Sequence, residues 1–177
     1  MACRVRRIRS GEGGRFQEIR LRALLESPSA FGASYAAESD RPLAHWEGLA
    51  TSWSDGDGGA LFVADTDEAW VGMAGGARRV DHLAFVAPPG TVSLGWMWVA
   101  PEARGGGLGR RLTDEVVAWA RSTGARQVDL WVRCDNGPAL SLYRGAGFSA
   151  VGEHSPLTSD PNYEVERMVL TIDTSPT

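Results

Sequence analysis

The chain has no lysine, so all 18 basic residues among its 177 are arginine. Against 22 aspartate and glutamate residues they give a net charge of −4. Proteins that bind DNA or RNA neutralise phosphates with a basic surface, so this balance disfavours nucleic acid as a partner. The basic run Arg4, Arg6, Arg7 and Arg9 is better explained by a solvated edge strand.

The chain is also poor in cysteine. Its two cysteines, Cys3 and Cys134, lie far apart and form no Cys-x-x-Cys pair. This argues against a disulfide framework and against a cysteine-based zinc site. The three histidines, His45, His82 and His154, have no metal-ligand spacing. We therefore expect no metal.

Long apolar runs are absent as well. No run approaches the ~20 residues that a membrane helix needs. The N-terminal segment lacks the apolar core of a signal peptide. We therefore expect a cytoplasmic protein without a membrane partner.

The length and composition suit one globular domain. A chain of 177 residues has room for one core. Its 43% apolar and 23% charged residues exclude a collagen-like, coiled-coil or disordered chain. We expect the domain to span residues 1–172, with a polar tail over residues 173–177.

Hydrophobic periodicity predicts strands interleaved with helices, which is typical of an α/β layer structure. The expected helices span residues 15–25, 43–51, 108–122 and 138–146. The expected strands span residues 3–9, 60–65, 69–78, 80–86, 92–99, 127–133, 148–153 and 164–172. In the first strand Arg4 and Arg6 are expected to face outward. Residues 26–40 are expected to form a loop.

A glycine-rich turn precedes the clearest helix. It reads Arg104-Gly105-Gly106-Gly107-Leu108-Gly109, with Arg110 next. Glycine lets the backbone approach a ligand closely, and the amides lie at the positive end of the helix dipole. The turn therefore predicts a diphosphate site. Its spacing fits neither a Walker A loop nor a Rossmann fingerprint and reads instead as Arg-x-x-Gly-x-Gly.

A second motif follows the next apolar strand. It runs from Asn136-Gly137-Pro138 through Tyr143 to Gly147-Phe148. Together the two motifs, in this order and spacing, resemble the GCN5-related N-acetyltransferase family over residues 92–153. The resemblance implies a single-domain fold with a mixed, mostly antiparallel sheet flanked by helices. The sheet would be splayed between its fourth and fifth strands, with acetyl-CoA in the V-shaped gap.

The resemblance also implies roles for individual residues. Tyr143 would protonate the departing thiolate, and a backbone N–H near Val99 would bind the oxyanion. Asn136 would contact the cofactor arm. The expected cofactor-binding residues on the fourth strand and the turn are Met97, Trp98, Val99, Arg104, Gly105, Gly106, Gly107, Leu108, Gly109 and Arg110. The simpler alternatives are that Tyr143 only packs in the core and that Asn136 only caps a helix.

Carboxylates that many relatives use as a base are missing. The strand over residues 92–99 contains none, and Trp131 stands where the branch that acetylates ribosomal protein N-termini has Glu. Glu38, Asp81 and Glu102 are the remaining candidates, and each is better explained as a solvated surface charge. The general base is therefore unassigned.

Aromatic residues gather near the expected gap. Trp96 and Trp98 share a face by strand alternation, and Trp131 lies on the facing strand. The residues expected to line an acceptor pocket are Phe31, Tyr35, Trp46, Trp96 and Trp131. The alternative for each is a place in the core. An aromatic wall suits a flat apolar acceptor or a cationic amine.

These features favour an acetyl-CoA-dependent N-acetyltransferase that needs no metal. Its acceptor would be a primary amine of a small molecule, with an antibiotic or a related metabolite as one class, attacked directly in a ternary complex. Two alternatives stay open: an enzyme that acetylates protein N-termini or lysines, and a non-catalytic acyl-CoA-binding regulatory module. Dimers are common in the family, so a homodimer is an expectation from the resemblance alone.

Overall fold

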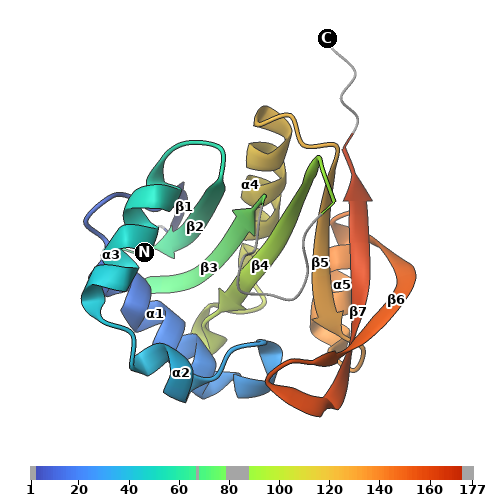
Figure 1. Ribbon diagram of the computed structural model, residues 1–177, viewed down its shortest axis with the longest axis horizontal. Coiled ribbons are helices and arrows are strands. Elements are labelled where there is room, and N and C mark those ends of the chain that lie inside the picture. The colour runs from blue at the N-terminus through green and yellow to red at the C-terminus, as the bar shows by residue number, and fades with distance from the viewer. Residues whose placement is uncertain (1–2, 67, 79–87, 173–177) are drawn as a thin grey trace.

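The computed structural model describes residues 3–66, 68–78 and 88–172, which form one seven-stranded sheet with helices on both faces (Figure 1). The strand order is β1-β2-β3-β4-β5-β7-β6. The strands are β1 (Arg4–Arg7), β2 (Gly59–Asp65), β3 (Trp70–Ala77), β4 (Thr91–Val99), β5 (Gln127–Arg133), β6 (Ser149–Leu157) and β7 (Asp160–Thr171). The helices are α1 (Gly13–Glu26), η1 (Pro28–Ala30), α2 (Tyr35–Ser39), α3 (Leu43–Ser54), η2 (Pro101–Ala103), α4 (Leu108–Ser122) and α5 (Gly137–Gly145).

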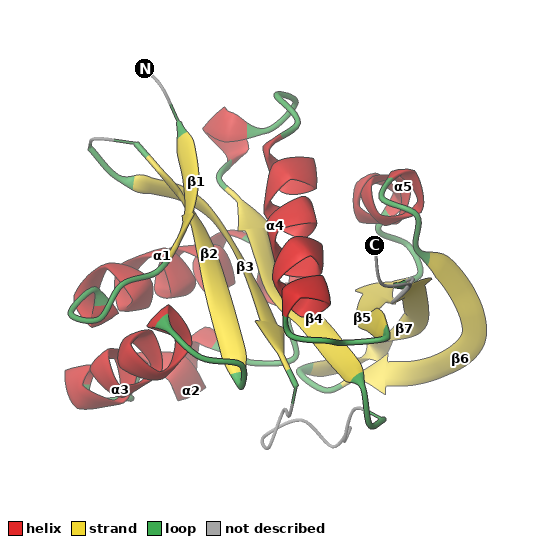
Figure 2. Ribbon diagram, turned by 90° about the horizontal axis from the view of Figure 1, so that it is seen from above, coloured by secondary structure: helices red, strands yellow, loops and turns green. Residues whose placement is uncertain are grey.

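The helices form two layers around the sheet. α4 covers β2, β3 and β4 on one face, and α5 lies on the same side over β5 and β7 (Figure 2). α1, α2 and α3 lie on the opposite side. Strand alternation in β2 supplies both cores, because Phe62 and Ala64 face α4 whereas Leu61 and Val63 face α1 and α3.

α4 has the bounds that the sequence predicts. Leu108, Leu112 and Val116 recur at helical spacing and are buried against the sheet. The helix begins after Gly107, which has a φ of 75°, and ends before Gly124, which has a φ of 73°. Both glycines adopt a left-handed conformation that other residues rarely take.

A bulge in β4 changes which side chains face which helices. Trp96 has a φ of 59°, and three residue steps of β4 oppose two of β3 at this point. Before the bulge, Val92 and Leu94 pack with α4. Beyond it, Trp96 and Trp98 pack with α1 and α3. The extra residue reverses the alternation, which is the ordinary effect of a β-bulge.

The sheet is splayed where the family resemblance places the gap. β4 and β5 are parallel and pair only through Thr91–Ser93 with Gln127–Asp129. All other strand pairs are antiparallel. From Leu94 to Val99, no pairing of β4 with β5 is present in the described chain. The predicted mixed sheet and its opening are confirmed.

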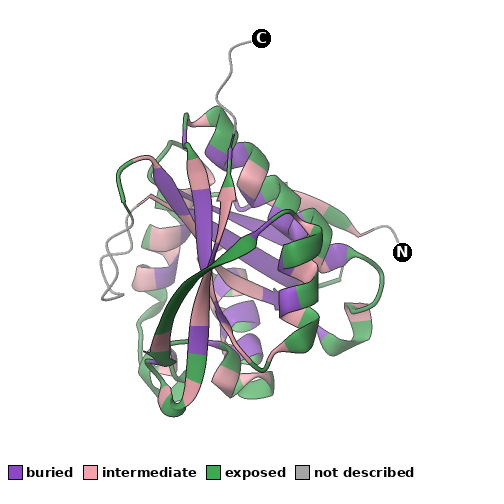
Figure 3. Ribbon diagram, turned by 90° about the vertical axis from the view of Figure 1, so that its right-hand side faces the viewer, coloured by how far each residue is buried: buried purple, intermediate pink, exposed green. Residues whose placement is uncertain are grey.

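Several boundaries differ from the prediction. Residues 26–40 contain η1 and α2 rather than a plain loop, and β6 and β7 are longer than expected. β6 is exposed along most of its length, because it is an edge strand without a helix over it (Figure 3). The strand predicted over residues 80–86 lies outside the described residues. In the ranges that are described, no helix is both long and apolar enough to cross a membrane.

Arg6 corrects the expectation that it faces outward. Its side chain is only 11% exposed and forms ion pairs of 2.6 Å with both Glu12 and Asp65. Pairing with two carboxylates lets the guanidinium leave water, which alternation in an edge strand does not reveal. β1 itself is an edge strand, as predicted, since within the described residues it pairs only with β2.

Candidate active site

The glycine-rich turn forms an open cradle at the start of α4. Gly105 and Gly107 have φ values of 82° and 75°. A Cβ placed on Gly105, Gly106 or Gly107 meets no atom within 4 Å. The first-turn amides, which include those of Leu108 and Gly109, have no partner inside the helix, and no side chain caps them. Space, free amides and the helix dipole together suit a phosphate group.

Two residues of the turn also hold helices together. A Cβ on Gly109 would lie 3.2 Å from Leu142, so glycine allows α4 to approach α5 here. Arg110 donates to Asp114 at 2.8 Å and to the Gly145 carbonyl at 2.7 Å. These contacts give Gly109 and Arg110 packing roles besides the cofactor role that the sequence suggests.

Arg104 links the end of β4 to α1. Its Nε donates to the Val99 carbonyl at 2.9 Å, and its Nη2 lies 2.8 Å from Glu26 Oε2. The same Glu26 oxygen accepts from the Trp98 indole at 3.0 Å. The Ser27 hydroxyl, followed by Arg104 and Trp98, donates to Glu26 and lowers the pKa of its carboxyl to about 2. Arg104 is thus anchored to α1 beside the cradle.

The open edge of β4 lies next to the cradle. Met97 and Val99 pack toward the core under α4, whereas Trp98 is buried toward α1. Because β5 has already diverged, the edge of this segment that faces the gap pairs with no strand of the described chain. Such an edge can bind an extended ligand that carries amide groups.

Tyr143 and Asn136 lie on the other side of the gap, in and before α5. Tyr143 is buried and packs edge-on against Phe148, with ring centroids 5.9 Å apart. Burial raises the pKa of Tyr143. The Asn136 side chain accepts from the Ala139 amide at 3.2 Å and so caps α5. The cap uses its oxygen, and the side-chain nitrogen is a further donor.

The tryptophan of the bulge belongs to an aromatic cluster between β4 and the opposite helices. Trp96 lies 5.3 Å from Phe16 and 5.5 Å from Trp53, between ring centroids. Trp46 is fully buried and packs against Phe16. Of the two places that the sequence allowed for Trp46, the acceptor pocket and the core, it therefore occupies the core. The guanidinium of Arg20 lies 4.4 Å from the Trp96 ring centre. The protein itself therefore supplies a cation to this ring.

Arg20 is the most deeply buried charge of this region. It is 4% exposed and lies between the rings of Trp96 and Phe31, with its charge 4.6 Å from the latter. Burial lowers the pKa of Arg20 to about 10. Of the other expected acceptor residues, Phe31 is buried, Trp131 is half-buried on β5 and Tyr35 is exposed.

A short segment crosses the open end of the gap. Residues 27–31, here called the strap, join α1 to the loop before α2. Arg133 at the end of β5 donates to the hydroxyl and the carbonyl of Ser29. The Ser159 hydroxyl in the β6–β7 turn donates to the Phe31 carbonyl. Figure 1 shows the strap meeting the β6–β7 hairpin beside α2. A pocket of about 360 Å³ lies between the strap and Asn136.

The carboxylate candidates for a base separate in the structure. Glu38 is buried on α2 and lies 3.8 Å from Arg41. Glu102 is exposed, and its hydrogen bond with Arg22 lowers its pKa, which weakens it as a base. Asp81 lies outside the described residues.

The sequence did not predict that Arg104 pairs with Glu26 or that Arg133 donates to Ser29 of the strap. Both depend on segments far apart in the chain, since Glu26 precedes Arg104 by 78 residues. A carboxylate at the end of a predicted helix gives no local signal for such a partner.

Comparisons with known proteins agree with this geometry. Residues 21–148 match the model of the acetyltransferase (GNAT) family. The chain is 37% identical over 100 residues to a mycothiol acetyltransferase of Actinosynnema mirum, a match that covers 56% of this chain and 31% of that protein. It is 32% identical over 113 residues to the aminoglycoside N(6')-acetyltransferase type 1 of Stenotrophomonas maltophilia, covering 63% of this chain and 71% of the relative.

The fold is shared with yncA of Salmonella typhimurium, whose structure contains its cofactor acetyl-CoA. The TM-score is 0.75 at 21% identity, over 100% of this chain and 98% of that one. The chain spans about a third of the length of the mycothiol acetyltransferases that it matches. The family model covers well over half of the chain, and the chain therefore belongs to the acetyltransferase (GNAT) family.

Proposed function

We propose that this chain is an acetyl-CoA-dependent N-acetyltransferase whose acceptor is a small-molecule primary amine. The observation that carries the cofactor half of the proposal is the open glycine cradle beside an unpaired β4 edge. The cradle suits a pyrophosphate, and the edge suits the amide-containing arm that joins a pyrophosphate to a thioester. Family membership supports the same ligand.

The residues around the gap suit the chemistry of the transfer. Acetyl-CoA supplies a thioester whose carbonyl carbon a neutral amine attacks, so that a C–N bond forms and the C–S bond breaks. A backbone amide near Val99 would stabilise the negative charge that develops on the carbonyl oxygen. Tyr143 would give its phenolic proton to the departing sulfur. The amine's own proton would leave through water, because no carboxylate stands in β4.

The environment of Tyr143 bears on that role. Because burial raises its pKa, the phenol stays protonated at neutral pH and can donate. The same burial makes it a weaker acid. The apolar surroundings also destabilise a thiolate anion, which favours moving the proton to sulfur as the C–S bond breaks.

The strap supports a small acceptor. It ties α1 to β5 and to the β6–β7 turn, so the open end of the gap is bridged rather than left as a broad groove. A bridged opening suits a compact molecule better than an extended peptide. The matched relatives named for mycothiol and for aminoglycosides also point to small molecules.

The test is a panel of amines incubated with acetyl-CoA, with free thiol and product mass as readouts. The panel should contain aminoglycosides, amino-sugar thiols, polyamines, amino acids and short peptides. One acetylated small molecule would support the proposal. Acetylated peptides alone would contradict the acceptor class, and acetyl-CoA binding without any transfer would favour a regulatory module.

Tyr143→Phe tests the acid on the acceptor so found. It should lower kcat about 100-fold, within the range of general acid catalysis, while the Kd for acetyl-CoA stays within about twofold. Tyr163→Phe is the matched control, because this tyrosine lies on β7 and its ring packs on Arg133. An unchanged kcat in Tyr143→Phe would show that the proton comes from elsewhere.

A further inference from the structure

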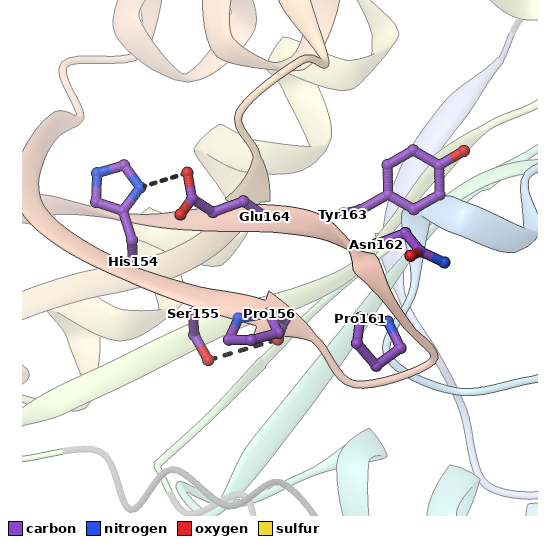
Figure 4. A pocket seen from close by; sticks show the side chains of 7 residues that line it. All are labelled: His154, Ser155, Pro156, Pro161, Asn162, Tyr163 and Glu164. Atoms are coloured by element: carbon purple, nitrogen blue, oxygen red, sulfur yellow. Dashed lines mark hydrogen bonds and ion pairs between the residues drawn. The ribbon is translucent and has the colours of Figure 1, made fainter.

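Three side chains with metal-binding atoms meet between the end of β5 and the β6–β7 hairpin. Cys134 follows β5, His154 belongs to β6 and Glu164 belongs to β7. Cys134 Sγ lies 3.7 Å from both His154 Nδ1 and Glu164 Oε2, and the last two atoms are 3.2 Å apart. Figure 4 shows His154 and Glu164 pointing toward each other from the two strands of the hairpin.

The three separations match the edges of a metal-centred tetrahedron. Zinc binds thiolate, imidazole and carboxylate at about 2.3, 2.0 and 2.1 Å, which places tetrahedral ligand atoms about 3.4–3.6 Å apart. Each observed separation lies within about 0.2 Å of that range. These distances allow all three atoms to contact one ion.

We propose that Cys134, His154 and Glu164 form a binding site for a zinc-like divalent transition metal ion, with water as the fourth ligand. Thiolate and imidazole select such ions over calcium and magnesium, which prefer oxygen. The side chains of His154 and Glu164 are 45% and 62% exposed, so an ion and its water can enter from solvent. The expectation of no metal rested on sequence spacing, which does not show that β7 pairs with both β5 and β6.

The charges around the cluster favour a cation. Glu166 adds negative charge to that of Glu164, whereas Asp135 is paired with Arg133. A divalent ion neutralises such carboxylate charge. The ion would join the end of β5 to the β6–β7 hairpin.

The test is titration of the untagged protein with Co²⁺ and Zn²⁺ in a phosphine reductant. The native chain should bind one Co²⁺ with a thiolate-to-metal charge-transfer band, which Zn²⁺ displaces. Cys134→Ser should lose the band and weaken Zn²⁺ binding at least tenfold. Cys3→Ser, which changes the other cysteine, should keep the charge-transfer band and the native affinity for Zn²⁺. His154→Ala and Glu164→Gln should each weaken Zn²⁺ binding about tenfold.

Thermal unfolding gives a second readout. Zn²⁺ should raise the Tm of the native chain and of Cys3→Ser, and raise that of Cys134→Ser clearly less. If Cys134→Ser does not fold, Glu164→Gln serves in its place, because it removes a charge and keeps the shape. Equal Zn²⁺ affinity in the native chain and these variants would overturn the proposal. A Co²⁺ complex without a thiolate band would overturn it as well. Neither outcome bears on acetyl transfer.

Discussion

Trp96 is the residue at which β4 leaves regular strand geometry. Its φ of 59° lies in the left-handed region, which costs a residue other than glycine about 1–3 kcal/mol. The packing around it holds this conformation, since Phe16, Trp53 and Arg20 all lie against its ring. The strained residue lies beside the gap. The bulge that it forms places Trp96 and Trp98 on the side of the sheet away from α4.

Glu26 gives a prediction at the residue scale. Its folded-state pKa of about 2 is below the ordinary 4.5, so its carboxylate stabilises the fold at pH above 4.5. This contribution is lost as pH falls from 4.5 toward 2. Urea unfolding at several pH values should show Glu26→Gln less stable than the native chain at pH 7, with the difference shrinking below pH 4.5. Glu18→Gln, exposed on the same helix, should show no such change. A difference independent of pH would contradict the assignment.

Single residues were predictable where their role is local. The glycines of the cradle and the cap at Asn136 could be predicted because turn and cap chemistry depends on near neighbours. The ion pairs of Arg6 and the cluster of Cys134 with His154 could not, because each depends on which strands pair. Local pattern carries no information about such partners.

Among the elements, α4 both packs the core and carries the glycine cradle at its start. Its apolar stripe is buried against β2, β3 and β4, while its first turn is left open. The buried stripe fixes where that turn lies relative to the edge of β4. The sequence predicted α4 and β5 with the observed bounds, because both have strong apolar periodicity. It did not predict η1 and α2, because these helices are too short to show apolar periodicity.

Gly106→Val tests the cradle at the element scale. Gly106 lies in open space and, unlike Gly105 and Gly107, does not adopt a left-handed conformation, so valine should fit the fold. Its methyl groups should instead occupy the anion site and raise the Kd for acetyl-CoA at least about tenfold, measured by calorimetry. Gly48→Val, an open glycine in α3, is the matched control. An unchanged Kd would show that these amides do not hold the pyrophosphate.

At the scale of the whole molecule, the sheet consists of two halves, β1–β4 and β5–β7, which are joined by a short strand pairing and by the strap. The strand pairing is the three-residue pairing of β4 with β5, and the strap bridges the other end. The family resemblance predicted the splay. The strap was not predictable, because its bonds join segments whose proximity depends on the complete strand order.

Ser159→Ala tests the strap. Removing the hydroxyl that donates to the Phe31 carbonyl should raise the acceptor KM about two- to tenfold, the effect of one hydrogen bond. The Kd for acetyl-CoA should not change. Ser155→Ala in the same hairpin, whose hydroxyl donates to the carbonyl of its neighbour Pro156, is the control. A lowered Tm with an unchanged acceptor KM would limit the strap to a structural role.

The strap also bears on the order in which the molecule folds. Its bonds join residues 104 and 128 positions apart in the chain, whereas the cradle lies directly between β4 and α4. Closing long loops costs entropy before their contacts repay it, so local units form first. A newly made chain should therefore complete the glycine cradle early and form the contacts of the strap last.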